Sequence, residues 1–126
     1  MAVVVAHAQM TTTKSGLQYN DVRVGTGEVA AKGKKVEVQY TGWLYVEGKK
    51  GTKFDSSVDR KKPLQFKLGS QEVIDGWDEG VEGMKEGGKR ELIVPPNLGF
   101  GRPDIAGIVP ANSTLFFEIE LTKVLK

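Results

Sequence analysis

One stretch of the chain alternates apolar and polar side chains more clearly than any other. From Val36 to Val46, one set of positions carries valine, tyrosine, glycine and leucine, and the intervening set begins with glutamate, glutamine and threonine. A period of two residues is typical of a strand with one buried face. Gly42 lies in the buried set, which indicates a bulge or a close approach of another segment. A sheet with one apolar face needs a covering layer, so the chain must supply one.

Shorter runs with the same alternation predict further strands at residues 17–24, 64–68, 89–94 and 115–125. Helical spacing is clear only after Ser70, which is a candidate helix cap. The apolar positions of this helix are Val73, Ile74, Trp77, Val81 and Met84. Gly76 and Gly80 lie on one face of it, so we expect close packing against the sheet. The fold class is therefore α+β, with an antiparallel sheet of about five strands covered by one short helix.

Two segments between these elements have no regular pattern. Residues 47–53 (EGKKGTK) are polar and rich in glycine, and they are interpreted as a loop. Residues 97–112 are predicted to form a long loop with apolar side chains, and loops of this length are usually functional. The last strand is expected to face inward through Leu115, Phe117, Ile119, Leu121 and Leu125. No internal repeat is evident, and residues 15–126 are assigned to one domain.

The N-terminal segment, residues 1–14, differs from this domain. Its apolar run from Ala2 to Ala6 is too short to span a bilayer. Ala6-His7-Ala8 has the form of a signal-peptidase site, but no basic segment precedes it. We interpret residues 1–14 as a flexible tail or the remnant of an export signal. A cytoplasmic protein is expected, and a periplasmic or secreted one is the alternative if the tail is such a remnant.

Composition excludes several kinds of chemistry. The chain has no cysteine, so disulfides, thiol nucleophiles and cysteine metal sites are impossible. The single histidine, His7, lies in the tail, where neither a zinc site nor a Ser-His-Asp triad can easily recruit it. Eighteen basic and sixteen acidic residues give a net charge of +2, which is too small to indicate nucleic-acid binding by itself.

Several short blocks of sequence, in one order, resemble the FKBP-type peptidyl-prolyl isomerases. They span about residues 15–126. Each block alone is weak evidence for the family, but together the blocks are specific. The blocks are residues 38–42 (VQYTG), 54–57 (FDSS), 71–77 (QEVIDGW), 100–101 (FG), 107–110 (GIVP) and 111–118 (ANSTLFFE). The resemblance implies a curved antiparallel sheet wrapped around a short helix. It also implies that the protein is similar to small, single-domain bacterial members.

The resemblance further implies the residues of an active site. An aromatic pocket would be formed by Tyr40, Phe54, Phe66 and Phe117, with Trp77 as its floor. Val73 and Ile74 would add an aliphatic wall, and the Ile74 N–H would bind a substrate carbonyl. Asp55 would lie at the pocket edge, held by Arg60 and Tyr40. The remaining implied site residues are Leu64, Glu72, Phe100, Ile105, Ile108 and Val109.

The same residues have a simpler interpretation if the resemblance is set aside. Trp77, Tyr40 and Phe117 would then be core residues, and Asp55 would cap a turn. Phe100 also departs from the family pattern, because tyrosine is usual at that position and its hydroxyl binds a ligand carbonyl. Loss of one hydrogen bond is worth about 0.5–1.5 kcal/mol, so we expect weaker ligand binding rather than lost activity.

The resemblance implies an enzyme that rotates Xaa-Pro bonds and assists protein folding without a metal or cofactor. Its partners would be proline-containing polypeptides and macrolides such as tacrolimus or rapamycin, with no nucleic acid and no membrane span. A monomer is expected. One alternative is a low-turnover module that binds proline segments or macrolides and has a chaperone-like role. It is favoured by Phe100, by Leu64 in place of an aromatic residue common in the family, and by the long connection from Tyr45 to Lys53. Another alternative is a surface-acting chaperone or virulence factor, if the chain is exported.

Overall fold

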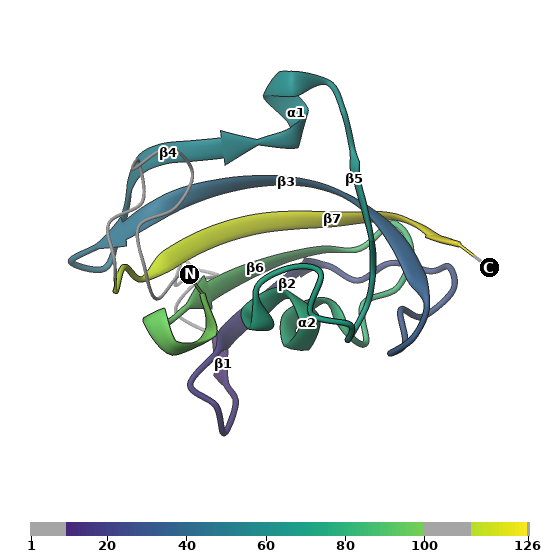
Figure 1. Ribbon diagram of the computed structural model, residues 1–126, viewed down its shortest axis with the longest axis horizontal. Helices are drawn as coiled ribbons and strands as arrows, with labels where there is room; N and C mark the ends of the chain where they lie inside the picture. The colour runs from purple at the N-terminus through teal and green to yellow at the C-terminus, as the bar shows by residue number, and fades with distance from the viewer. Residues whose placement is uncertain (1–9, 100–111, 126) are drawn as a thin grey trace, which may run out of the picture.

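The strand predicted from the alternating stretch is the longest of the sheet. The computed structural model describes residues 10–99 and 112–125, and within them β3 runs from Lys35 to Val46 (Figure 1). Its residues alternate between buried and less buried positions from Val36 to Gly42, as the sequence pattern predicts. Val36 and Val38 are fully buried. The apolar side chains of one face thus enter the core, while the other face meets solvent.

The described strands form a single antiparallel sheet. The order along it is β1-β2-β6-β7-β3-β4, and β5 also pairs with β3. Because β7 follows one edge of β3 along nearly its whole length, β4 and β5 share the other edge. The remaining strands are β1 (Thr11–Thr12), β2 (Gln18–Arg23), β4 (Lys49–Ser56), β5 (Leu64–Lys67), β6 (Lys89–Val94) and β7 (Leu115–Leu125).

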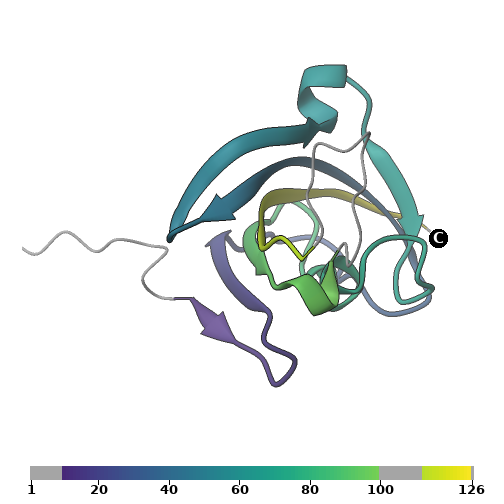
Figure 2. The ribbon, with the colours of Figure 1, turned by 60° about the vertical axis from the view of Figure 1, so that its left-hand side comes forward.

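Short helices complete the described part of the chain. They are α1 (Ser57–Arg60), α2 (Asp75–Val81) and the 3₁₀ helix η2 (Pro96–Leu98). The sheet is strongly curved, and α2 lies on its concave side, against β6 (Figure 2). Among residues 10–99 and 112–125, no helix has the length and apolar character needed to cross a membrane.

The start of α2 differs from the prediction. Ile74, not Ser70, occupies the cap position, and it makes no side-chain capping bond. The carboxylate of Asp78 instead accepts hydrogen bonds from the backbone N–H groups of Gly69 and Gln71, at 2.8 and 2.9 Å. A side chain inside the helix therefore shapes the turn that leads into it, and the helix begins two residues after Val73.

The two glycines of α2 bring the helix against the sheet, as predicted. A Cβ atom on Gly76 would lie 2.7 Å from Val94 Cγ1, and one on Gly80 would lie 2.7 Å from both Cδ atoms of Leu92. Real Cβ contacts are essentially never shorter than 3.0 Å. The helix backbone thus lies closer to β6 than any larger residue at these positions would allow.

The number of strands was underestimated, because seven are present in the described residues instead of about five. The interpretation of residues 47–53 as a loop was wrong beyond Gly48, since β4 begins at Lys49. The lysines of β4 conceal it in the sequence, and charged side chains of this kind are typical of edge strands. The fold also begins before Ser15, because Thr11 and Thr12 pair with β2. His7 and the Ala6-His7-Ala8 motif lie outside the described residues.

The inward face of β7 changes partway along the strand. Leu115 to Leu121 face inward at alternate positions as predicted, but the next buried residue is Val124 rather than Leu125. The register with β3 shifts at Thr122, because Lys123 pairs with Glu37 and Leu121 pairs with Val38. One extra residue on one strand reverses the side-chain faces beyond it.

We predict that Gly80→Ala destabilises the protein by about 1–3 kcal/mol, since the added methyl group would collide with the fully buried Leu92. In an unpacked helix the same change would stabilise by up to ~1 kcal/mol. Urea unfolding measures the free energy difference, with the exposed Glu82→Ala at the helix end as control. A Gly80→Ala variant as stable as the parent would show that helix and sheet can separate without cost.

Candidate active site

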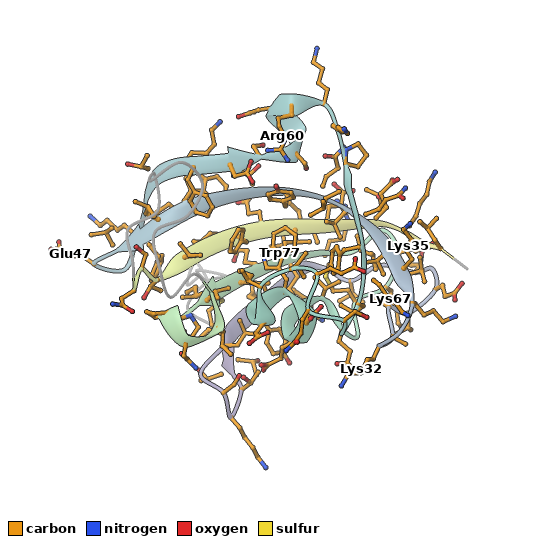
Figure 3. The ribbon with its side chains drawn as sticks, in the orientation of Figure 1. Lys32, Lys35, Glu47, Arg60, Lys67 and Trp77 are labelled. Atoms are coloured by element: carbon orange, nitrogen blue, oxygen red, sulfur yellow. The ribbon has the colours of Figure 1, made fainter. Side chains whose placement is uncertain are left out.

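A cavity opens on the concave side of the sheet, over the middle of the molecule. Its volume is about 160 Å³. An apolar cavity of ~150 Å³ holds a molecule the size of benzene, so this one can take up a five-membered ring. Trp77 lies at the centre of this region (Figure 3). The lining residues are Tyr40, Phe54, Asp55, Leu64, Val73, Ile74, Trp77 and Phe117.

The cavity lies where the shared edge of β3 changes partners. β5 pairs with β3 as far as Val38, and β4 pairs from Thr41 onward. The Tyr40 N–H falls between the two strands and donates instead to the Ser57 hydroxyl, at 2.7 Å. Ser57 is completely buried and donates in turn to the Gln39 side chain, at 2.6 Å. This serine, which the sequence analysis did not single out, satisfies the backbone at the gap where the cavity opens.

Three aromatic rings surround the indole of Trp77. The ring centroids of Tyr40 and Phe117 lie 4.7 and 5.2 Å from it, at interplanar angles of 77° and 85°. Such edge-to-face pairs are favourable, because the positive edge of one ring meets the negative face of another. Phe66 lies 6.0 Å away and is tilted at 48°. The indole is only 4% exposed, so it forms a rigid floor.

Gly42 makes room for the aromatic wall of the cavity. A Cβ atom at this position would lie 2.7 Å from Phe117 Cε1 and 2.8 Å from Phe54 Cζ. Phe54 and Phe117 meet at 5.7 Å, edge to face, over the glycine. The register between β3 and β4 also shifts next to Gly42. The close approach expected at Gly42 is confirmed, whereas the irregularity lies on the partner strand, where Phe54 is the extra residue between Lys53 and Asp55.

The polar groups of the site form a network at the cavity edge. The Tyr40 hydroxyl donates to Asp55 Oδ2 at 2.6 Å and accepts from Arg60 Nη2 at 3.0 Å. Arg60 also forms an ion pair with Asp55 Oδ1, which accepts from the Ser56 N–H at 2.9 Å. Each carboxylate oxygen is thus engaged, and Asp55 is held by Arg60 and Tyr40 as the resemblance implied. Asp55 lines the cavity, and its negative charge there is paired with Arg60 and bound by the Tyr40 hydroxyl.

Burial and the hydrogen bond to Asp55 raise the pKa of Tyr40 above its ordinary value, and the contact with Arg60 only partly offsets this. The phenol therefore keeps its proton at neutral pH and remains a donor to Asp55. A neutral hydroxyl at this position preserves the low polarity of the cavity wall.

The structure brings together most of the predicted site residues. Phe66 is buried beneath the floor, where it contacts Trp77 and does not line the cavity. Arg60 lies outside the lining and acts through Asp55 and Tyr40. Four predicted site residues lie outside the described residues: Phe100, Ile105, Ile108 and Val109. Among the residues that are described, no group of three or more carboxylate or histidine side chains is placed to hold a metal ion.

Glu72 is not at the cavity. Its carboxylate accepts a hydrogen bond from the Lys67 N–H at 2.9 Å and lines a different depression. The next residue, Val73, does line the cavity, so the chain at this point separates the two hollows. The assignment of Glu72 to the ligand-binding cavity is therefore corrected for its side chain.

Comparison with protein families gives one match over most of the chain. Residues 26–122 match the family described as FKBP-type peptidyl-prolyl cis-trans isomerase. An FK506-binding protein of Neisseria meningitidis serogroup B is 52% identical over 109 residues, which cover 86% of this chain and 96% of that protein. FK506-binding protein 1A of Neurospora crassa is 46% identical over 110 residues, or 86% and 88% of the two chains.

Solved structures agree with these relatives. FkpA from Escherichia coli aligns with a TM-score of 0.78 and 41% identity, over 91% of this chain and 51% of that one. AtFKBP13 aligns with a TM-score of 0.79 and 37% identity, over 93% and 99% of the two chains. The curved sheet and its short helix are thus shared along nearly the whole chain.

We predict that Tyr40→Phe removes about 1 kcal/mol of stability at neutral pH, because the phenol donates to a carboxylate at a half-buried edge. The raised pKa of Tyr40 adds a pH dependence. The advantage of the parent over Tyr40→Phe should be constant below about pH 10, the ordinary tyrosine value, and shrink as the pH rises through the raised value. Urea unfolding of both proteins from about pH 8 to about pH 11 measures this difference. A difference independent of pH would contradict the proposed network.

Proposed function

The chain belongs to the FKBP-type peptidyl-prolyl cis-trans isomerases, and we propose that it rotates Xaa-Pro bonds in the cavity over Trp77. Its substrates are polypeptides that contain proline. The observation that carries the assignment to this cavity is its combination of size and polarity. It can hold a proline ring, its walls are aromatic and aliphatic, and its charged groups are bound to one another at the edge.

Rotation of a prolyl amide breaks no covalent bond, so the site must only lower a rotational barrier of about 20 kcal/mol. The planar amide is stabilised by resonance, which separates charge and is favoured by water. The twisted transition state has less charge separation. An apolar cavity that excludes water therefore favours the twisted amide over the planar one, which is the condition for catalysis.

The chain entering α2 supplies the group that would orient the substrate. Ile74 caps the helix, and its carbonyl accepts from the N–H groups of Trp77 and Asp78. Within the described residues, no acceptor for the Ile74 N–H itself is found. We assign this donor to a substrate carbonyl next to the proline. A bond to a flanking carbonyl would hold the chain without stabilising the planar form of the rotating amide.

The network around Asp55 has a supporting role. It fixes the Tyr40 ring against the indole of Trp77, through one hydroxyl that is both donor and acceptor. Two walls of the cavity are thereby rigid before substrate binds. Membership of an isomerase family does not favour the alternative of a low-turnover binding module.

FK506 is a second expected ligand. Relatives that share about half of the sequence are named FK506-binding proteins. The same apolar cavity that accepts a proline ring would accept the corresponding ring of the macrolide. Substrate and FK506 would thus compete for one site.

We predict that Val73→Asp lowers kcat/KM at least tenfold (~1.4 kcal/mol), because a carboxylate on the cavity wall would retain water there. Val73 is only half-buried, so the variant should fold. Val24→Asp is the matched control, since Val24 is 65% exposed and does not line the cavity. NMR exchange between the cis and trans forms of an Xaa-Pro peptide measures the rate. Equal rates for the two variants would place catalysis elsewhere, and a parent rate no faster than buffer would refute the function.

FK506 binding should change the fluorescence of Trp77. The chain has two tryptophans, and Trp43 contacts Phe116 rather than the cavity. The Trp43→Phe variant thus isolates the signal of Trp77. We expect a saturable change in emission on addition of FK506, and its reversal by an excess of Xaa-Pro peptide. Binding detected by calorimetry without any change in emission would place the macrolide outside this cavity.

A further inference from the structure

A second depression is lined by residues of β5 and of the segment before α2, which are next in sequence to residues that line the active-site cavity. It has a volume of about 620 Å³ and is bounded by the ends of β3, β5 and β7. Lys35 and Lys67 lie at this end of the molecule, away from Trp77 (Figure 3). We call it the lysine depression, and its side chains come from Lys34, Lys35, Gln65, Lys67, Glu72 and Leu125.

Two lysines of the lysine depression lie side by side on adjacent strands. Lys35 of β3 is the direct register partner of Lys67 of β5, and both are exposed. Like charges directly opposite one another destabilise a strand pair. Neither ammonium group forms an ion pair within the described residues. The pair is thus a positively charged site whose repulsion an anion would relieve.

The carboxylates around the lysine depression are already bound to other groups. Glu28 forms an ion pair with Lys34 at 3.0 Å. Glu37 accepts from the side chains of Gln65 and Thr122 at 3.1 and 2.9 Å, and these bonds hold its pKa below the usual value. One oxygen of Glu72 accepts the Lys67 N–H. None of these groups neutralises Lys35 or Lys67 directly.

The lysine depression and the active-site cavity share a common border. Leu64 lines the cavity and Gln65 lines the depression because consecutive residues of β5 point to opposite faces of the sheet, so the two sites lie on opposite faces and meet at the edge of β5 that does not pair with β3. Val73 and Glu72 are divided in the same way. From Leu64 to Lys67 the strand rises about 10 Å, and a bound chain would also have to pass over the edge of β5 to reach the other face. An extended polypeptide with its proline in the cavity would need about four to six residues for this path.

We propose that the lysine depression is a secondary substrate site, which binds an acidic side chain of the polypeptide whose proline occupies the cavity. The inference rests on the proposed function and names the substrate class: proline segments with aspartate or glutamate about four to six residues from the proline. Lys35 and Lys67 would together contact the carboxylate. Because both lysines are exposed, the contact depends on ionic strength.

The test is a series of Xaa-Pro peptides followed by NMR exchange, which needs no coupled protease. Each peptide carries a pair of glutamates about two, four or six residues before or after the proline, and a glutamine pair at the same position is its neutral counterpart. We expect one spacing to raise kcat/KM about three- to tenfold over glutamine at low salt. The preference should fall below about twofold at ~0.5 M salt, where charges on the surface are screened.

Two double variants of equal charge assign the effect. Lys35→Gln with Lys67→Gln should abolish the preference and leave the rate on the glutamine peptide unchanged. Lys49→Gln with Lys85→Gln removes the same charge from residues outside the lysine depression and should preserve the preference. Both pairs are exposed, so neither should impair folding.

The outcomes separate this inference from the proposed function. No turnover of the glutamine peptides would refute the proposed function itself. Normal turnover with no glutamate preference at any spacing would overturn only the secondary site, as would a preference that survives loss of Lys35 and Lys67. Salt-sensitive binding of an oligonucleotide that these two substitutions abolish, with no preference among the peptides, would assign the lysine depression to nucleic acid and likewise overturn the inference.

Discussion

The division of one edge of β3 between two strands is the constraint on which the site depends. β7 occupies the opposite edge almost throughout, so that side of the sheet is continuous. On the divided edge, β5 ends its pairing at Val38 and β4 begins at Thr41. A backbone N–H left between two strands would be costly in a buried place. The Ser57 hydroxyl accepts it, and the gap can therefore stay open as the mouth of a cavity. α1 belongs to the connection that spans the gap, and its last residue, Arg60, reaches back to Asp55.

The cavity also depends on empty space at glycines. Gly76 and Gly80 let α2 approach β6, which sets the depth at which Trp77 lies. Gly42 admits the rings of Phe54 and Phe117 on the opposite wall. The floor and the walls are thus positioned by backbone contacts and not by the aromatic rings alone. The polar groups of the site bind one another, since Tyr40, Asp55 and Arg60 form one network of hydrogen bonds and an ion pair. The other walls of the cavity are apolar.

Much of the fold could be predicted from local patterns. The strand around Val36 to Val46 and the final strand have a period that their own residues reveal. The helix was predicted in the right place, but of its five apolar positions only Trp77 and Val81 lie within α2, while Val73, Ile74 and Met84 lie outside it. The strand β4 shows no such period, because an edge strand contributes few buried side chains and its lysines resemble those of a loop. The burial of Val124 in place of Leu125 could not be predicted from the alternating pattern either. It arises from an irregularity at Thr122, which exists only in the pairing of β7 with β3.

The residues of the site could likewise be predicted only in part from local sequence. The order of short motifs identified Tyr40, Asp55, Trp77 and Phe117, because each is part of a recognisable block of sequence. Nothing local could show that Glu72 faces away from the cavity while Val73 enters it, or that Lys35 meets Lys67. The periodicities, the positions of the glycines and the exclusion of cysteine chemistry can all be read from the order of residues along the chain. Which residues share a cavity follows only from the folded structure, because strand register and the direction of each side chain are set by pairing between segments far apart in the chain.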